Sequence, residues 1–234
     1  MNFPSTDKKP MPYRRVILRG VLGVFILIGI LFGFAGRWNF WQGWAILGGT
    51  MAYMAAILIL FRNKMDLIRE RIKPGPGTKW WDKVFFAVYA PLSYAIVIVG
   101  SLDAGRFGWT DSFPWWGYGI GYFLYIGSLC LILWAMWVNN FFSSTVRIQT
   151  DRGHSVCQDG PYAYIRHPGY AFAMVLMVGL ALCLGSLYAL IPAAGVWAAI
   201  IVRTGLEDAV LHNELPGYKE YAEKVRWRLL RGIW

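Results

Sequence analysis

Hydrophobic residues occur in long blocks along this chain, separated by short polar segments. Several blocks approach the ~20 residues that a helix needs to cross a hydrocarbon core, while the last two are short. These two flank Gly185-Ser186, which predicts a tight helical hairpin. The sequence therefore predicts an all-α, polytopic membrane bundle of about six transmembrane helices. The predicted spans are Val16 to Gly36, Trp44 to Phe61, Val84 to Ser101, Trp116 to Val138, Tyr170 to Leu184 and Leu187 to Val202.

A shorter periodic segment follows the second block. Met65, Ile68 and Ile72 recur at helical spacing among basic residues, and Lys73-Pro74-Gly75-Pro76-Gly77 then breaks the pattern. Residues 62–73 therefore predict a short amphipathic helix on the membrane surface.

The segment from Asn139 to Pro168 is long, polar and rich in turn-forming residues, which is typical of a binding loop or lid. After the last block, residues 203–215 predict a helix that Pro216-Gly217 ends, and residues 218–225 predict another. We expect two regions: an amino-terminal bundle of four spans over residues 1–138, and a polar core with the last hairpin over residues 139–234.

Composition and charge agree with a membrane protein. The chain is 57% apolar and only 15% charged, away from the averages of soluble domains. If the chain crosses at every block, 21 of the 23 lysines and arginines lie on one side, and only Arg37 and Arg106 lie on the other. This positive-inside bias places both termini and the 139–168 loop in the cytoplasm. The net charge of +10 then reflects the orientation of the chain in the membrane. We expect the basic residues to contact membrane lipids, and we expect no binding of nucleic acid.

Several kinds of site are not supported. The three cysteines form no CxxC pair and read as small packing residues, and the three histidines are dispersed, so we expect no metal site. There is no Walker sequence and no GxGxxG after a strand, which argues against a soluble nucleotide-binding fold. The positions concerned are Cys130, Cys157, Cys183, His154, His167 and His212.

The unusual polar residues converge on the last hairpin. Gln149, His154 and the run from Tyr162 to Tyr170 enter it, whereas Arg203 and Glu207-Asp208 leave it. Because a hairpin brings its two ends together, we expect these clusters to meet. Two simpler interpretations stay open: Arg203 and Glu207 can form an ordinary i,i+4 contact, and Arg166 can reach a lipid headgroup.

These residues resemble a known family. The run Gly160-Pro161-Tyr162 through Arg166-His167-Pro168-Gly169-Tyr170, followed by Arg203 and Glu207-Asp208 and by a Tyr218, Tyr221 tail, resembles the isoprenylcysteine carboxyl methyltransferases. Phosphatidylethanolamine N-methyltransferases share the pattern more distantly. The resemblance covers roughly residues 139–234, and it implies an integral-membrane enzyme that uses S-adenosylmethionine.

The resemblance also implies roles for single residues. Arg203 would be the substrate-side arginine and, with Glu207, catalytic. A family glutamine that contacts the cofactor aligns with Arg147, with Gln149 two residues later. Asp208 stands where eukaryotic relatives usually have glutamate. The cofactor pocket would be formed by Gln149, His154, Val156, Cys157, Tyr162, Arg166, His167, Pro168, Gly169, Tyr170, Glu207 and Asp208.

The acceptor stays open between two chemistries. The carboxylate of an isoprenylcysteine-like or other lipid-like acceptor needs no general base, and Arg203 would orient it. A phospholipid amine must lose a proton, which makes Glu207, Asp208 and His167 base candidates. Two other functions are alternatives: an NADPH-dependent membrane sterol or enone reductase, and a non-catalytic lipid-binding protein. The sequence does not indicate an oligomeric state.

Overall fold

The computed structural model describes residues 13–72 and 76–234, with side chains from residue 17 onward. Within these ranges the chain forms helices and loops and no strand, which confirms the all-α prediction. The α-helices are α1 (Tyr13–Ala35), α2 (Trp41–Leu60), α3 (Met65–Ile72), α4 (Trp80–Ser101), α5 (Trp115–Val138), α6 (Pro168–Leu184), α7 (Leu190–Glu214) and α8 (Tyr218–Lys224). A π-helical segment, η1 (Leu102–Phe107), continues α4, and η2 (Thr150–Arg152) and η3 (Gly160–Ala163) are short 3-10 turns.

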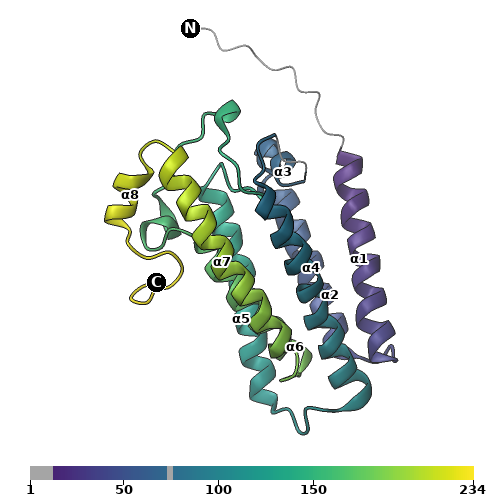
Figure 1. The fold of residues 1–234 in the computed structure, drawn as a ribbon. Helices are drawn as coiled ribbons and strands as arrows, with labels where there is room; N and C mark the ends of the chain where they lie inside the picture. The colour runs from purple at the N-terminus through teal and green to yellow at the C-terminus, as the bar shows by residue number, and fades with distance from the viewer. Residues whose placement is uncertain (1–12, 73–75) are drawn as a thin grey trace.

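Among the described residues, five helices are long and apolar enough to cross a membrane. They lie side by side in one bundle, together with the shorter apolar helix α6 (Figure 1). The chain is therefore an integral membrane protein by the length and composition of its helices. The candidate spans are residues 17–35, 41–60, 80–107, 115–138 and 190–214.

The prediction was wrong about the last span. It gave a short span to Val202 and a separate tail helix, whereas α7 runs without a break for 25 residues, from Leu190 to Glu214. The helix continues past its polar residues because these residues have partners. Arg203 pairs with Asp82 on α4, and the Thr204 hydroxyl donates to the carbonyl of Ile200. The helix ends just before Leu215, whose helical conformation the following proline disfavours.

The predicted hairpin turn at Gly185-Ser186 is confirmed. Gly185 ends α6 in the left-handed conformation, with φ of +76°. The Ser186 hydroxyl donates to the buried carboxylate of Asp103 in η1, 2.6 Å away, and Thr110 donates to the same carboxylate through its amide and its hydroxyl. These bonds join the hairpin tip to the end of α4 and explain why helical structure there extends past the predicted limit at Ser101.

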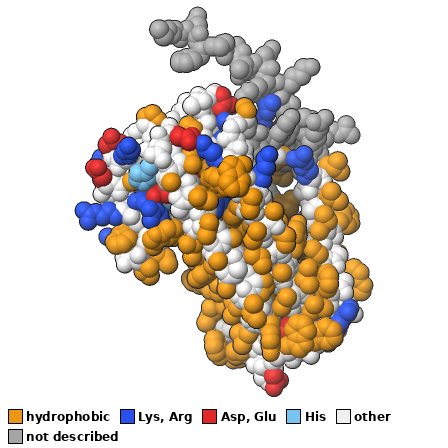
Figure 2. Space-filling model, in the orientation of Figure 1, with side chains coloured by type: hydrophobic (Ala, Val, Ile, Leu, Met, Phe, Trp, Pro, Cys, Tyr) orange, Lys and Arg blue, Asp and Glu red, His pale blue; other side chains and the backbone are white. Residues whose placement is uncertain are grey.

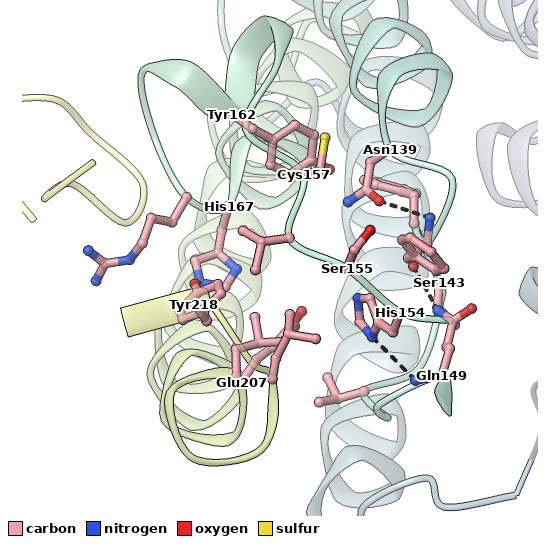
Figure 3. Close-up of a pocket in the computed structure, with 18 of the residues that line it drawn as sticks. Asn139, Ser143, Gln149, His154, Ser155, Cys157, Tyr162, His167, Glu207 and Tyr218 are labelled. Carbon is pink, nitrogen blue, oxygen red and sulfur yellow. Dashed lines mark hydrogen bonds between the residues drawn. The ribbon is translucent and has the colours of Figure 1, made fainter. Parts of the chain in front are cut away.

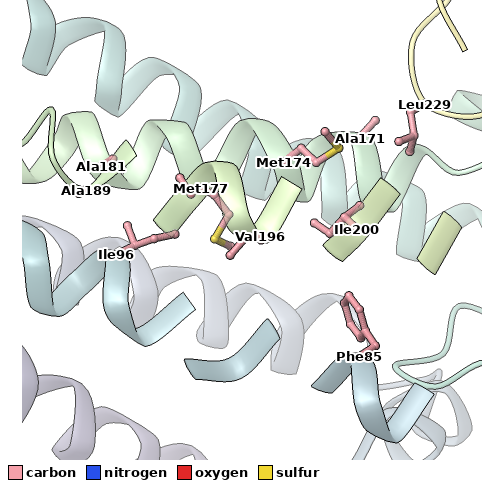
Figure 4. Close-up of a cluster of buried hydrophobic side chains, with 11 residues drawn as sticks. Phe85, Ile96, Ala171, Met174, Met177, Ala181, Ala189, Val196, Ile200 and Leu229 are labelled. Carbon is pink, nitrogen blue, oxygen red and sulfur yellow. The ribbon is translucent and has the colours of Figure 1, made fainter. Parts of the chain in front are cut away.

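The largest cluster of buried apolar side chains lies between α4, α6 and α7. Ile96 on α4 faces Met177 on α6 and Val196 on α7, as Figure 4 shows. Helix α6 also lies against α5 at close range, because a Cβ on Gly179 would come within 2.6 Å of the backbone nitrogen of Tyr125. This packing holds α6 and α7 firmly in the bundle, so their polar ends are held in place as well.

The predicted amphipathic helix exists as α3, but its apolar side faces the protein. Leu67 and Ile68 are buried against Phe61 of the α2–α3 turn and Met136 of α5. The predicted breaker falls partly on Lys73, Pro74 and Gly75, which lie outside the described residues. Helix α3 is therefore a packed element, positioned to contact the loop that follows α5.

Most charged side chains gather at one end of the molecule in the view of Figure 2, where α3 and α8 lie. Hydrophobic side chains cover most of the rest of the bundle, and a few charged ones lie at the opposite end. The exposed large hydrophobic residues include Phe25 on α1, Phe123 on α5 and Ile191 on α7. Such a surface suits a bilayer, with the charged end at its edge.

Candidate active site

A cavity opens at the charged end of the bundle. Figure 3 shows His154 and Gln149 on one side of it and Glu207 and Tyr218 on the other. About 810 Å³ of space lies between its atoms, part of it open to solvent. Its walls come from the loop between α5 and α6, the start of α6, the end of α7, and α8. The two predicted clusters therefore meet in space, as the hairpin requires.

Most of the predicted cofactor residues line this cavity, although what they bind stays a prediction. Those that line it are Gln149, His154, Val156, Cys157, Tyr162, Arg166, His167, Gly169, Tyr170 and Glu207. Pro168, Asp208 and Arg203 are outside the lining. Lining residues without a predicted role are Asn139, Phe141, Phe142, Ser143, Thr145, Val146, Ser155, Leu211 and Leu215. The polar composition of the 139–168 loop indicated this segment as a whole, but no pattern singled out its members.

Tyr170 and Glu207 connect the two ends of the hairpin directly. The Tyr170 hydroxyl, from the first turn of α6, donates a short hydrogen bond to the Glu207 carboxylate on α7. The Tyr170 ring also stacks parallel to the His167 ring, with centroids 5.8 Å apart. Glu207 is thus a carboxylate on the cavity wall that is held by a phenol; the described part of the chain gives it no arginine partner.

The loop wall of the cavity is anchored to α3. Arg147 donates from Nε to Glu70 of α3 at 2.6 Å and from Nη1 to Asp151 at 2.8 Å. The hydrogen bond to Glu70 raises the pKa of Arg147, so the guanidinium stays charged. A second bond joins the Ser144 hydroxyl to the carbonyl of Arg71, also on α3. No sequence pattern indicated the partnership of Glu70 and Arg147, because 77 residues separate them.

Gln149 and Arg147 were the two alternatives for one predicted cofactor contact. The Gln149 amide donates to the carbonyl of Phe141 at 2.8 Å, and its oxygen accepts from Arg152. Both functions of Gln149 are therefore engaged inside the loop. Arg147 Nη2 is buried and has no hydrogen-bond partner in the described part of the chain, and the same holds for the Thr145 hydroxyl two residues earlier.

Asp208 is the centre of a buried hydrogen-bond cluster beside the cavity. Arg166 donates to it from Nε and Nη2 at 2.9 and 3.0 Å, and Nε of Arg228 donates at 2.9 Å. The Tyr218 hydroxyl donates at 2.8 Å, and His167 Nε2 lies 3.1 Å away. Asp208 is only 1% exposed. The structure thus places this predicted cofactor residue where it holds α6, α7 and α8 together behind the cavity wall.

Arg203 lies one helical turn from Glu207 but turns away from it. Its Nη2 pairs with Asp82 of α4 at 2.8 Å and donates to the carbonyl of Ser144 at 2.7 Å. The guanidinium carbon is 4.2 Å from the ring centroid of Phe85 and 5.2 Å from that of Tyr170. The Tyr170 ring therefore contacts Arg203 and also lines the cavity. Asp82 was missed because an acid in the first turn of a helix is common and carries no motif.

His154 is a neutral member of the wall. Burial, with the nearby cations of Arg147 and Arg152, lowers its pKa to about 4. Its Nδ1 accepts the amide N–H of Gln149 at 3.2 Å, so in the neutral ring the proton sits on Nε2. The ring packs against Phe141, with centroids 4.6 Å apart. Burial also raises the pKa of the Cys157 thiol, which keeps it protonated and makes it a poor nucleophile.

The chemistry of this wall fits S-adenosylmethionine, which is both polar and cationic. Glu207 and the faces of Tyr162 and Tyr170 offer a carboxylate and electron-rich rings for a cation. The unpartnered Thr145 hydroxyl and Arg147 Nη2 are donors on residues that line the same cavity, and they can satisfy a carboxylate or hydroxyl group of a ligand.

Comparison with known proteins agrees with the fold and the cavity. The sequence model of the phospholipid methyltransferase family matches residues 116–215, from the start of α5 to the end of α7. This match confirms the resemblance to membrane methyltransferases and includes most of the cavity wall. A search of curated proteins finds no match to the chain. The match supports a membrane methyltransferase, and it leaves the acceptor open.

Proposed function

We propose that the protein is an S-adenosylmethionine-dependent methyltransferase that acts on a lipophilic acceptor at the membrane surface. The observation that carries the proposal is the cavity between the 139–168 loop and the end of α7, within the region that matches the phospholipid methyltransferase family. Its position at the charged end of a membrane bundle gives a water-soluble donor and a lipid acceptor a place to meet.

The bound donor would supply an electrophilic methyl group on a sulfonium. The residues of this chain would hold donor and acceptor in place and exclude water, which is the main requirement for an in-line displacement. Glu207 and the Tyr170 ring would face the cation, Arg147 and Thr145 would bind its polar groups, and His154 would donate from Nε2. The Arg166–Asp208 cluster would keep His167 and Tyr218 in position.

Two acceptor classes remain in the proposal. An isoprenylcysteine-like carboxylate is ionised at neutral pH and needs an arginine, for which Arg203 is the candidate. A phospholipid amine needs a base, and Glu207 on the cavity wall is the nearest candidate on α7. The phospholipid methyltransferase match favours the second class.

We further propose that the charged end, the cavity and both termini are cytoplasmic. The excess of lysine and arginine on one side of the predicted spans supports this orientation. Of these residues, Lys8, Lys9 and Lys73 lie outside the described residues. Membrane lipids would be the partners of the exposed apolar surface, and no role for nucleic acid is proposed. The division into a bundle over residues 1–138 and a methyltransferase core over residues 139–234 stays a prediction.

The test is calorimetric titration of S-adenosylmethionine into the purified protein in nanodiscs. We expect binding, and we expect Glu207→Gln to weaken it and to lower turnover of an amine acceptor by about 10²–10⁴-fold if Glu207 is the base. Lys219→Gln, on the exposed side of α8, is the matched control and should bind like wild type. Absence of donor binding to folded wild-type protein would refute the proposal.

The two alternatives make different predictions in the same assay. A reductase would bind NADPH in place of S-adenosylmethionine, and a non-catalytic lipid-binding protein would transfer no label from methyl-labelled donor. Binding of NADPH, or donor binding without any transfer to extracted lipids, would favour them over a methyltransferase.

A further inference from the structure

We propose that Asp82 of α4 determines which acceptor the protein takes: by neutralising Arg203 it excludes carboxylate acceptors and leaves the site to a lipid with an amine headgroup. This inference rests on the proposed function and gives Asp82 a role that the family motif does not include. Asp82 lies outside residues 116–215, the part of the chain that the family match covers.

The Asp82–Arg203 pair is enclosed. Asp82 is 0% exposed and Arg203 is 5% exposed, and their atoms are 2.8 Å apart. Within this ion pair the negative charge of the carboxylate cancels the positive charge of the arginine. Phe85, Phe86 and Tyr170 surround the guanidinium, so water cannot screen the pair.

Charges near Tyr170 balance while Asp82 is ionised. Arg71 of α3 is the other cation nearby; it stacks on Phe142 at 5.0 Å and interacts electrostatically with Tyr170 and Arg203. The two acids are Asp82 and Glu207. Around Tyr170, these two cations and two acids leave no net positive charge beside Arg203 to attract a carboxylate acceptor. Glu207, which accepts a hydrogen bond from Tyr170, can take a proton from an ammonium headgroup and release it to solvent.

One nitrogen of Arg203 is free to donate a hydrogen bond to a ligand. Its Nε is buried and has no hydrogen-bond partner among the residues that the structure describes, although Nη2 serves both Asp82 and Ser144. If the charge of Asp82 is removed, the arginine regains a net positive charge and its planar fork can bind a carboxylate. The site would then carry a net charge of +1 and favour anionic acceptors.

Asp82 also supports the wall of the cavity proposed to bind the methyl donor. Its Oδ2 accepts the backbone N–H of Val146 at 3.0 Å, and Val146 lines the cavity. Asp82→Asn keeps an oxygen that can accept this bond and removes only the charge. Asp82→Ala removes both, so it would disturb donor binding as well. The asparagine variant therefore separates choice of acceptor from support of the loop.

The experiment uses the full chain in nanodiscs with methyl-labelled donor and two acceptors, phosphatidylethanolamine and N-acetyl-S-farnesylcysteine. We expect wild type to prefer the amine lipid, and Asp82→Asn to shift the ratio of kcat/KM values about 10-fold or more toward the carboxylate, since loss of a charge partner at a buried site has effects of this size. The donor Kd should change less than about 3-fold, well under the 1.4 kcal/mol of a tenfold change.

Glu214→Gln is the matched control. It removes one acid that joins the same two helices, because Glu214 at the end of α7 pairs with Lys79 beside α4, but this pair is exposed and outside the cavity lining. Its acceptor ratio should equal that of wild type. A purely structural role for Asp82 would slow both acceptors equally and leave the ratio unchanged.

Several results would overturn the inference. One is a wild-type preference for the carboxylate, which decides the matter even if Asp82→Asn fails to fold. Another is an unchanged ratio in folded Asp82→Asn, and a third is turnover of neither acceptor by protein that binds the donor. In the first two the donor binds and its methyl group is transferred, so the proposed function survives. In the third, the proposed function survives only if label still passes from the donor to extracted lipids. Absence of donor binding refutes the proposed function, and this inference with it.

Discussion

Two buried arginine–aspartate pairs flank the cavity, and they differ in how completely they are hydrogen-bonded. Arg166 gives two bonds to Asp208 and two more, from Nη1, to the carbonyls of Val225 and Arg226. Arg203 meets Asp82 through Nη2 alone, and its Nε has no partner within the described ranges. Four of the five N–H donors of Arg166 are thus engaged, whereas Arg203 has a whole nitrogen free for a ligand among the described residues. The comparison therefore assigns structural support to the first pair and control of the acceptor to the second.

The largest effect is expected from removing Asp208, the acid of the pair with more hydrogen bonds. Asp208→Ala leaves Arg166 and Arg228 without their carboxylate in a buried setting, which costs about 3–5 kcal/mol of stability. Thermal unfolding in nanodiscs should show a large fall in melting temperature, with loss of donor binding. Near-normal stability of this variant would remove the distinction between the two pairs.

Exchange of each arginine for lysine sharpens the comparison. Arg166→Lys loses the planar fork and with it several charge-assisted bonds, so we expect a loss of about 2–3 kcal/mol. Arg203→Lys can keep one contact to Asp82 and should lose about 1 kcal/mol, mainly from its contacts with the aromatic rings. Denaturation of the two variants in parallel measures this order. A larger loss for Arg203→Lys than for Arg166→Lys would reverse our assignment.

Lowering the pH should destabilise the cavity wall through His154. The pKa of His154 is about 4 in the folded protein and 6.5 in the unfolded chain, so the unfolded state binds more protons between these values. The contribution of a neutral His154 is present above pH 6.5 and is lost as the pH falls toward 4. Melting temperature and donor affinity should decline over this window, and His154→Asn should flatten the decline. An equal decline in the variant would assign it to another group.

The smallest loss of stability is expected from an ion pair at the surface. The Lys79–Glu214 pair joins α4 and α7 at the surface, with side chains 30% and 44% exposed. Exposed pairs of this kind contribute about 0–1 kcal/mol, so Glu214→Gln should shift the melting temperature little. A shift as large as that of Arg166→Lys would mean that exposure does not separate these pairs.

The sequence predicted the bundle well where the physics is local. A run of apolar residues long enough to cross a bilayer specifies a helix almost by itself, because unpaired backbone groups are costly in lipid. The end of α7 was misjudged for a related reason. Arg203, Glu207 and Asp208 look like a departure from the membrane, but α4, α6 and α8 supply a partner for each of them. Partners that lie far away in the sequence cannot be read from a local pattern.

The candidate site also has features that follow from local sequence and features that depend on distant partners. The sequence by itself determined the helical class, the hairpin turn, and the meeting of the 160–170 run with Glu207, because a short hairpin allows no other arrangement of its ends. Only the tertiary structure decided that Asp208 supports the wall from behind, that Gln149 is engaged within its own loop, and that Asp82 holds Arg203. The physical reason is that a buried charge takes its role from the groups that pair with it. Packing brings those groups together from as little as 10 residues away, for Tyr218 and Asp208, to as many as 121, for Asp82 and Arg203.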